Sequence, residues 1–348
     1  MAYTTIDNPV DYFTTVLSTS TGSALTIDTG FKPDWLWTKA RNFARSHELH
    51  DTTRGDNKRL KSDATTAEES YSNYLTFTST GATFGTNHNL GYHAEGATTG
   101  VSWAWKANGG TTATNTSGTN IDSTVQANTT AGFSIITYTG TGTDNDSIGH
   151  GLGAVPSMFI IKRRSGTEDW AVYHHKNTSA PETDHLLLNT TDATSDSDTR
   201  FSDQAPSSTV ITLGNNAVVN ANSSTYVCYA FAEKQGYSKF GSYTGNGSTS
   251  DGAFVYTGFS PAWVLMKRTS GTEAWMLVDN KRPGFNVIDD VLEPNDSAAE
   301  GASTDIDLLS NGFKLRKDNS NVSGETYIYM AFAESPFVSS KGVPTTAR

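Results

Sequence analysis

The sequence predicts an all-β protein built of three tandem β-sandwich-like or jelly-roll-like units. Short runs of β-branched and aromatic residues, such as MFIIK and TYVCYAFAE, alternate with clusters of Gly, Asn, Asp and Ser, which is typical of many short strands. Runs with helical periodicity are almost lacking. In addition, one hairpin-like motif occurs twice with near identity, as VPSMFIIKRRSGTEDW and SPAWVLMKRTSGTEAW.

The composition agrees with a chain of folded β domains. The chain has 348 residues, a length typical of two or three domains. Aromatic residues make up 11% of it, which is too many for a disordered chain. The net charge of −11 and the lack of a dense basic run argue against a nucleic-acid partner. We interpret the short basic stretch Lys58–Lys61 as a solvated face, because acidic residues follow it.

The repeated motif defines the domain organisation. An offset of 105 residues aligns its two copies without a gap and places Pro156 on Pro261 and Lys162 on Lys267. A fainter third copy lies near the N-terminus, where an offset of 123 residues places Pro33 on Pro156. A second signature, SWAWKA, CYAFAE or YMAFAE, closes each copy. The repeats therefore predict three units of roughly a hundred residues each.

The boundaries of the units follow from the spacing of these signatures and from local composition. The stretch GGTTATNTSGTNIDSTVQANTT has almost no apolar residues and is the best candidate for a linker. We predict unit 1 over residues 1–108, a linker over 109–130, unit 2 over 131–236, unit 3 over 237–336 and an extended C-terminal tail over 337–348.

Each copy of the motif has a physical interpretation as a β-hairpin. Gly153-x-x-Pro156 makes a turn and begins a strand with a residue that donates no ladder hydrogen bond. The run from Met158 to Ile161 is apolar on both faces, which predicts a central strand. Ser165-Gly166 then turns the chain, and the return strand begins at Trp170, whose large apolar area favours burial.

The cysteine content and the N-terminal sequence bear on disulfide formation, secretion and membrane insertion. Cys228 is the single cysteine, so no intrachain disulfide forms, and its apolar surroundings predict a small buried hydrophobe. The segment MAYTTIDNPVDYF lacks the basic and apolar regions of a signal peptide. No stretch approaches the roughly 20 apolar residues of a membrane span. We expect no membrane insertion.

Two acid–base pairs are candidates for a ligand site. Asp51-x-x-Arg54 in unit 1 and Asp279-x-x-Arg282 in unit 3 both follow the hairpin, whereas unit 2 has His174 at the equivalent position. One interpretation is a local salt bridge of small energetic value. The alternative is a polar ligand site in which a carboxylate and a guanidinium bind the ligand together.

Other chemistry has weaker support in the sequence. No Gly-x-Ser-x-Gly, His-Glu-x-x-His or phosphate-loop motif occurs, so we predict no catalytic residues and no cofactor. The acidic stretches TDNDS and DATSDSD lack the spacing of an EF-hand, so we predict no metal site, although calcium binding by these loops stays open.

Several stretches resemble an uncharacterised repeat domain of tailed-bacteriophage virion proteins. They are GFKPDWLWTKAR, IGHGLGAVPSMFIIKRRSGTEDW and the C-terminal YIYMAFAESPFVSSKGVPTTAR. That domain is frequent in phages of marine bacteria and cyanobacteria, in proteins described as tail-fibre-like. The resemblance runs from Asp11 to the end of the chain. It is weakest in unit 1, where NFARSHEL replaces the Ser-Gly-Thr-Glu turn.

The resemblance implies a structural component of the virion rather than an enzyme. We expect a tail fibre or tail-associated host-attachment protein, assembled in the host cytoplasm and located in the virion. Its expected partners are other virion proteins, further copies of the chain in a trimer, and a host surface polysaccharide or receptor. Two alternatives stay open. One is a capsid-decorating, head-fibre or adaptor protein with an architectural role. The other is a polysaccharide depolymerase that uses paired carboxylates, for which Glu168 and Glu273 recur as equivalents.

Overall fold

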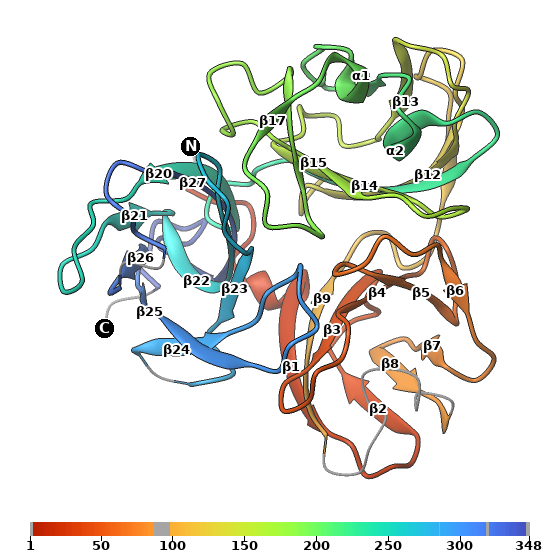
Figure 1. Cartoon of the computed structure of the whole chain (residues 1–348). Helices are drawn as coiled ribbons and strands as arrows, with labels where there is room; N and C mark the ends of the chain where they lie inside the picture. The colour runs from red at the N-terminus through yellow and green to blue at the C-terminus, as the bar shows by residue number, and fades with distance from the viewer. Residues whose placement is uncertain (1–2, 87–97, 285, 318–319, 346–348) are drawn as a thin grey trace.

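The fold is all-β, as predicted from the sequence. The structure is a computed structural model that describes residues 3–86, 98–284, 286–317 and 320–345. These residues form six β-sheets and only short helices. Figure 1 shows three lobes around a common centre, coloured red to orange, yellow to green, and cyan to blue along the chain. We call them unit 1 (residues 3–108), unit 2 (109–236) and unit 3 (237–345).

The elements of each unit are as follows. Unit 1 contains η1 (Pro9–Asp11), β1 (Phe13–Thr19), β2 (Leu25–Asp28), β3 (Trp35–Ala40), β4 (Glu48–Asp51), β5 (Lys58–Lys61), β6 (Glu69–Ser70), β7 (Leu75–Phe77), β8 (Gly81–Phe84) and β9 (Thr99–Trp105). Unit 2 contains β10 (Ala113–Asn115), β11 (Ser123–Asn128), β12 (Phe133–Thr139), β13 (Asp146–Gly149), β14 (Met158–Arg163), β15 (Trp170–His174), β16 (Asp184–Leu187), β17 (Ser195–Asp196), α1 (Asp198–Phe201), β18 (Val210–Leu213), α2 (Ala217–Asn220) and β19 (Thr225–Phe231). Unit 3 contains β20 (Ser238–Thr244), β21 (Phe254–Tyr256), β22 (Phe259–Arg268), β23 (Met276–Asp279), β24 (Ile288–Val291), β25 (Gly301–Leu309), β26 (Gly312–Leu315) and β27 (Thr326–Pro336).

One strand order occurs in all three units. An early strand of the unit (β1, β12 or β20) pairs with the last, the last with the Gly-x-x-Pro strand, and that strand with its return strand, as β1-β9-β3-β4, β12-β19-β14-β15 and β20-β27-β22-β23. A second sheet packs against each of these, formed by β2-β8-β7, β13-β18 and β21-β26-β25-β24. Each unit is therefore a sandwich with an apolar core of its own.

The Gly-x-x-Pro turn keeps the same backbone conformation in every unit. Gly30, Gly153 and Gly258 all have a positive φ, between 66° and 82°, which residues other than glycine rarely adopt. The strand begins two residues after the proline in units 1 and 2. In unit 3 the strand extends further back, and Pro261 sits at a shift in the register with β27, where a missing N–H is tolerated.

The strand that follows this turn is buried on both faces, as its apolar pattern predicts. In β3, Leu36 lies in the sandwich core of unit 1, and its neighbours Trp35 and Trp37 point to the opposite face. In β14, Phe159 and Ile160 alternate in the same way. The second face of each of these strands therefore faces something other than its own small sheet.

That second face packs into a core shared by the three units. The aromatic residues of the closing strands meet there, with ring centroids of Trp105 and Phe332 5.6 Å apart and those of Phe231 and Phe332 6.1 Å apart. Trp35 stacks on Tyr229 of unit 2 at 4.6 Å. All seven tryptophans of the chain are among the fully buried side chains. Burial of so much aromatic area makes this shared core a main source of stability.

Two segments differ from the sequence prediction. Residues 109–130 are not a structure-free linker, because β10 and β11 lie within them and extend the sheet of unit 2 beyond β12. Backbone hydrogen bonds from β11 to β12 and from β10 to β11 hold them there, which a composition poor in apolar residues does not reveal. The described part of the predicted extended tail folds back on itself, since Val338 pairs with Pro344. The other unit boundaries stay predictions.

The N-terminal segment ties unit 1 to unit 3. The hydroxyl of Tyr3 donates to the carbonyl oxygen of Gly258 at 2.6 Å, and the Ser340 N–H donates to Asp7 at 2.6 Å. From Tyr3 onward the described chain thus first contacts unit 3 and then enters unit 1 at β1 (Figure 1). Within the described residues, no helix has the length and hydrophobicity required to cross a membrane.

Candidate functional site

The predicted pair Asp51 and Arg54 lies in the interface between units 1 and 2. Neither side chain has exposed surface, and they form an ion pair directly after β4. The guanidinium also donates to the carbonyl oxygen of Leu49 at 2.8 Å and pairs with Glu68 at 3.1 Å. From unit 2, the hydroxyl of Tyr229 donates to Asp51 at 2.7 Å. Burial raises the pKa of Tyr229 well above its usual value, which keeps this donor protonated.

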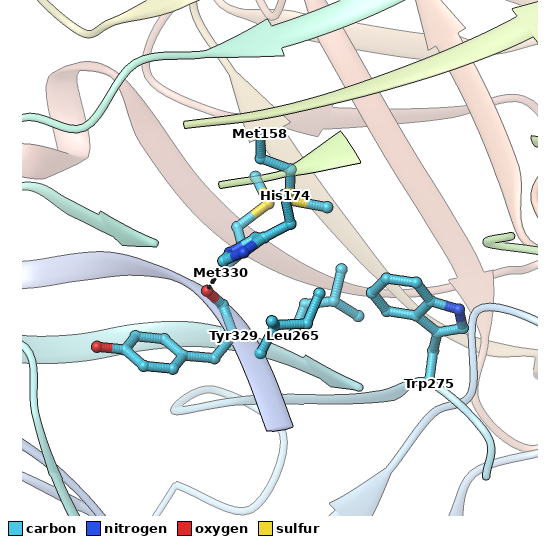
Figure 2. A pocket seen from close by; sticks show the side chains of 7 residues that line it. Met158, His174, Leu265, Trp275, Tyr329 and Met330 are labelled. Carbon is cyan, nitrogen blue, oxygen red and sulfur yellow. Dashed lines mark hydrogen bonds between the residues drawn. The ribbon is translucent and has the colours of Figure 1, made fainter. Parts of the chain in front are cut away.

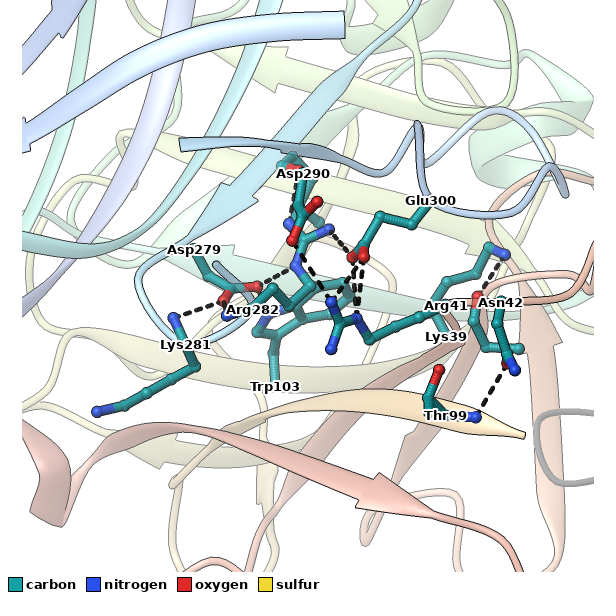
Figure 3. Close-up of polar contacts among 12 residues, drawn as sticks. Lys39, Arg41, Asn42, Thr99, Trp103, Asp279, Lys281, Arg282, Asp290 and Glu300 are labelled. Carbon is teal, nitrogen blue, oxygen red and sulfur yellow. Dashed lines mark hydrogen bonds and ion pairs between the residues drawn. The ribbon is translucent and has the colours of Figure 1, made fainter. Parts of the chain in front are cut away.

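The pair Asp279 and Arg282 occupies the equivalent place between units 3 and 1. Its ion pair measures 2.7 Å (Figure 3), and neither side chain has exposed surface. The indole N–H of Trp103 in unit 1 donates to Asp279 at 3.0 Å. Glu300 bridges Arg282 and Arg41 of unit 1, at 2.9 Å and 2.7 Å. The same type of contact therefore closes two of the three interfaces.

The interface between units 2 and 3 has His174 in place of the aspartate. Its Nε2 lies 3.2 Å from the carbonyl oxygen of Tyr329 (Figure 2). Its Nδ1 accepts from the Lys176 N–H at 3.1 Å. These partners require a neutral ring that carries its proton on Nε2. Burial lowers the pKa of His174 to about 3, which agrees with a neutral ring. The surrounding gap, lined by Met158 and Met330, has no space for a water molecule.

The residue that faces this position from the neighbouring unit explains why unit 2 has a histidine where units 1 and 3 have an aspartate. The closing signatures align Trp103, Tyr229 and Met330 at one position. Trp and Tyr supply a hydrogen-bond donor, which a carboxylate accepts, whereas Met supplies none. A buried aspartate opposite Met330 would lack this donor, and a neutral histidine instead donates to the backbone carbonyl. The repeats therefore differ at both of these positions together.

The recurring lysine of the motif makes a second set of contacts between units. In every copy the ammonium group is buried and donates to a loop carbonyl of the neighbouring unit. The pairs are Lys39 with Ser297 at 3.2 Å, Lys162 with Thr65 at 2.9 Å and Lys267 with Thr191 at 3.3 Å. Burial lowers the pKa of each of these lysines to about 8. Conservation of the lysine among the repeats thus reflects assembly of the units.

The tryptophan of the return strand makes a third set. The indole N–H of Trp170 donates to the Lys61 carbonyl of unit 1 at 2.8 Å, and that of Trp275 donates to the Leu187 carbonyl of unit 2 at 2.9 Å. His47 stands at this position in unit 1, fully buried. The lysine and tryptophan contacts run from each unit to the unit before it along the chain, and from unit 1 to unit 3, so the contacts form a closed cycle.

The predicted ligand residues are therefore interface residues. The structure brings Asp51 to Arg54 and Asp279 to Arg282, as the salt-bridge interpretation expects, but in two separate interfaces and without exposed surface. Tyr229 and Trp103 were not predicted as partners, because residues about 176 positions away cannot be recognised from local spacing. The sequence signal that points to these two residues is the alignment of the closing signatures, which places Trp103 and Tyr229 at the same position.

Other candidate residues from the sequence are buried or form contacts within the fold. Cys228 is fully buried in the core of unit 2, as predicted. Asp146 accepts hydrogen bonds from Asn120 and Thr141. Within the described parts of the chain, no group of three or more His, Cys, Asp or Glu side chains is arranged to hold a metal ion. Glu168 pairs with Arg163 at 3.5 Å, so a local ion pair occupies it.

One sequence interpretation is wrong at its central residue. The stretch Lys58–Lys61 is not a solvated face, because Arg59 is only 3% exposed. Its guanidinium donates to Glu48 at 2.9 Å and to the hydroxyl of Tyr74 at 2.8 Å. Of the acidic residues that follow in the sequence, Glu69 pairs with Arg59 and Lys61. A buried ion cluster therefore lies where the sequence suggested a surface.

Comparison with known proteins yields one family. A family model described as a domain of unknown function (DUF7483) matches residues 8–336. This match extends across all three units, so the family model describes the three units together rather than a single repeat. No curated protein and no solved structure matches the sequence.

Proposed function

We propose that this chain, which belongs to the DUF7483 family, is a non-enzymatic structural protein of a bacteriophage particle, in a tail fibre or a tail-associated host-attachment device. The cyclic set of contacts between units is the observation that carries the proposal. The polar residues that recur among the repeats contact neighbouring units in the interior. Their recurrence is accounted for by assembly of a rigid body, with no need of a catalytic role.

The outer surface supports an attachment role. Phe254 and Tyr256 on β21 are 47% and 55% exposed, and β21 is the edge strand of its sheet. Exposed aromatic side chains supply much of the binding energy at protein and carbohydrate interfaces. Three sandwiches on one rigid body also present several surfaces per chain. Weak contacts then add up through avidity, and more so in an oligomer.

The same surface supports a second candidate function. An exposed apolar edge strand is also a docking place for another virion protein. A capsid-decorating, head-fibre or adaptor protein would use it for packing, with contacts above about 1,000 Å².

The depolymerase alternative has less support. Glu168 lies at the interface of units 2 and 1, and Glu273 at that of units 3 and 2, where their N–H groups donate to Thr65 and Thr191. The two carboxylates thus belong to separate interfaces, and do not flank one groove.

Labelling of the particle tests the proposal. Antibodies against the purified chain, tagged with gold, are applied to particles of a phage that encodes it and viewed by electron microscopy. We expect label on the tail or its fibres. Label spread over the capsid would reject the attachment role in favour of decoration, and particles without label would reject a virion location altogether.

A further inference from the structure

Strand β21 of unit 3 is an edge strand with an aromatic outer face. The sheet order β21-β26-β25-β24 places it at one side of its sheet, at the periphery of the molecule (Figure 1). Phe254 and Tyr256 are 47% and 55% exposed. Val255 between them is 6% exposed and belongs to the core of the sandwich. The strand thus has one face in the core and one face that presents two aromatic rings.

The backbone of β21 has hydrogen-bonding groups directed to its open side. The Ala253 carbonyl and the Thr257 N–H make hydrogen bonds of 3.0 Å on the β26 side. Because the direction of these groups alternates along an antiparallel strand, Val255 also bonds to β26, whereas the N–H and C=O groups of Phe254 and Tyr256 point away from it. Within the part of the chain that the structure describes, these outward groups have no hydrogen-bond partner.

In unit 2 the chain itself covers the equivalent positions. The repeat offset of 105 places Gly149 and Gly151 at the positions of Phe254 and Tyr256. Cβ atoms on these two glycines would lie 2.0 Å from a side chain of β10 and 2.9 Å from one of β11. The absence of a side chain is therefore required there by the close approach of β10 and β11.

The edges of the equivalent strands are also protected in units 1 and 2. The Ser147 N–H of β13 donates to the Thr119 carbonyl at 3.2 Å, and Asn120 forms a parallel bridge with Ser147, so extended polypeptide takes this edge. In unit 1 the outer positions are Thr26 and Asp28, which are polar and exposed. A charged residue on an edge discourages strand pairing. Strand β21 has no charged residue, and no described segment pairs with its outer edge.

We propose that β21 pairs with β21 of a second copy of the chain, in a two-fold symmetric antiparallel arrangement centred on Val255. In this register Phe254 of each copy lies opposite Tyr256 of the other. Both residues direct their backbone groups outward, so each such pair exchanges two hydrogen bonds and every outward group has a partner. Directly opposite side chains lie on the same face, so the aromatic rings pair across the two strands.

This self-complementary register favours a second copy over a foreign strand. A strand from another protein could bond the same backbone groups, but Phe-Val-Tyr supplies to itself the matched aromatic pairs on the outer face and a valine on the core side. An isologous interface requires this kind of match. The two four-stranded sheets join into one continuous sheet, and the rings of both copies gather on its outer face. The inference rests on strand geometry and is independent of a virion location.

Sedimentation velocity of the full-length chain at increasing concentration tests this pairing. We expect a monomer–dimer equilibrium at concentrations up to about 100 µM, because an interface of three residues per copy is small. Tyr256→Ala removes the ring alone. Tyr256→Pro removes the ring and the outward N–H, at an edge position where proline is tolerated. We expect the proline variant to dimerise about tenfold more weakly than the alanine variant, or less still, because the dimer loses two backbone hydrogen bonds.

A matched control is Leu17→Ala, which truncates an apolar side chain that is 41% exposed on β1, the edge strand of unit 1. It is expected to leave dimerisation unchanged. Circular dichroism establishes that the variants are folded. Hydrogen exchange of the parent chain gives a second readout that needs no variant. We expect a peptide spanning residues 252–258 to exchange more slowly at high than at low protein concentration.

Several results would overturn the proposal. They are a chain that is monomeric over the whole range, and equal dimerisation of the alanine and proline variants, which would show that the rings associate without strand pairing. A trimer without a dimer would overturn it as well, since one β21 edge pairs with only one other. Exchange of the 252–258 peptide that is independent of concentration would have the same meaning. The measurements use no phage particle, so a dimer together with unlabelled particles would keep the interface and reject the virion proposal.

Discussion

At the scale of single residues, the protein uses buried charges as connectors between its units. Arg282 is fully buried and is compensated by Asp279 and Glu300. We predict that Asp279→Asn lowers the free energy of unfolding by about 3–5 kcal/mol, because it removes the fully buried one of these two carboxylates. Urea unfolding followed by tryptophan fluorescence measures this loss.

A matched control is the partly exposed pair of Lys239 and Glu233. Lys239→Gln removes one charge there, as Asp279→Asn does in the interface, and is expected to cost less than about 1 kcal/mol. Equal losses in the two variants would contradict the view that the buried pairs hold the units together.

Buried histidines predict how stability depends on pH. The pKa of His174 is about 3 in the folded chain, well below the value of about 6.5 of an unfolded one. Between these values the unfolded chain binds a proton that the folded chain does not, so stability falls as the pH drops below 6.5. For this residue the loss from pH 6.5 to pH 5.5 is roughly 1 kcal/mol.

The variant His174→Gln isolates this contribution. Glutamine keeps an N–H for the Tyr329 carbonyl but takes up no proton. The loss of unfolding free energy between pH 7.5 and pH 5.5, measured with urea, is expected to be smaller in the variant than in the parent chain. A pH dependence that is identical in both chains would mean that His174 is not the buried neutral group described above.

At the scale of elements, each return strand is matched to the closing strand of another unit. His174 faces Met330, whereas aspartates face Tyr229 and Trp103. We predict that His174→Asp is strongly destabilising, by about 3 kcal/mol or more, although aspartate occupies this place in the other units. The reason is that the new carboxylate would meet a carbonyl oxygen and a thioether, with no arginine nearby.

Restoring the partners should recover part of the loss. The triple variant His174→Asp, Asn177→Arg, Met330→Tyr rebuilds the set found between units 1 and 2, and we expect it to unfold at a higher urea concentration than His174→Asp alone. If His174→Asp alone were as stable as the parent chain, position 174 and Met330 would not be coupled.

The elements that the sequence predicted are those with a strong local pattern. The strand after each Gly-x-x-Pro turn is apolar on both faces. The turn itself requires a glycine, because Gly153 has a positive φ, and this glycine makes the turn recognisable in the sequence. Strands β10 and β11 escaped prediction, because they have few apolar residues and are held by backbone hydrogen bonds, of β11 to β12 and of β10 to β11. The burial of Arg54 escaped as well, since it depends on Tyr229 in another unit.

At the scale of the whole molecule, the three sandwiches form one closed body. Aromatic residues of all three closing strands share a single core, and lysine, tryptophan and acid–base contacts repeat around it. The N-terminal segment adds a further tie, from Tyr3 to unit 3. Removal of one unit would expose the inner faces of the other two, so no unit should be stable alone.

Hydrogen exchange during urea unfolding is the most direct test of this account. The parent chain is pulse-labelled at increasing urea concentrations, and mass spectrometry follows peptides from β9, β19 and β27, one from each unit. The account predicts that all three strands lose protection at one common urea concentration, because the shared core couples them in a single cooperative transition. Separate midpoints, with one unit still protected after another has unfolded, would contradict it.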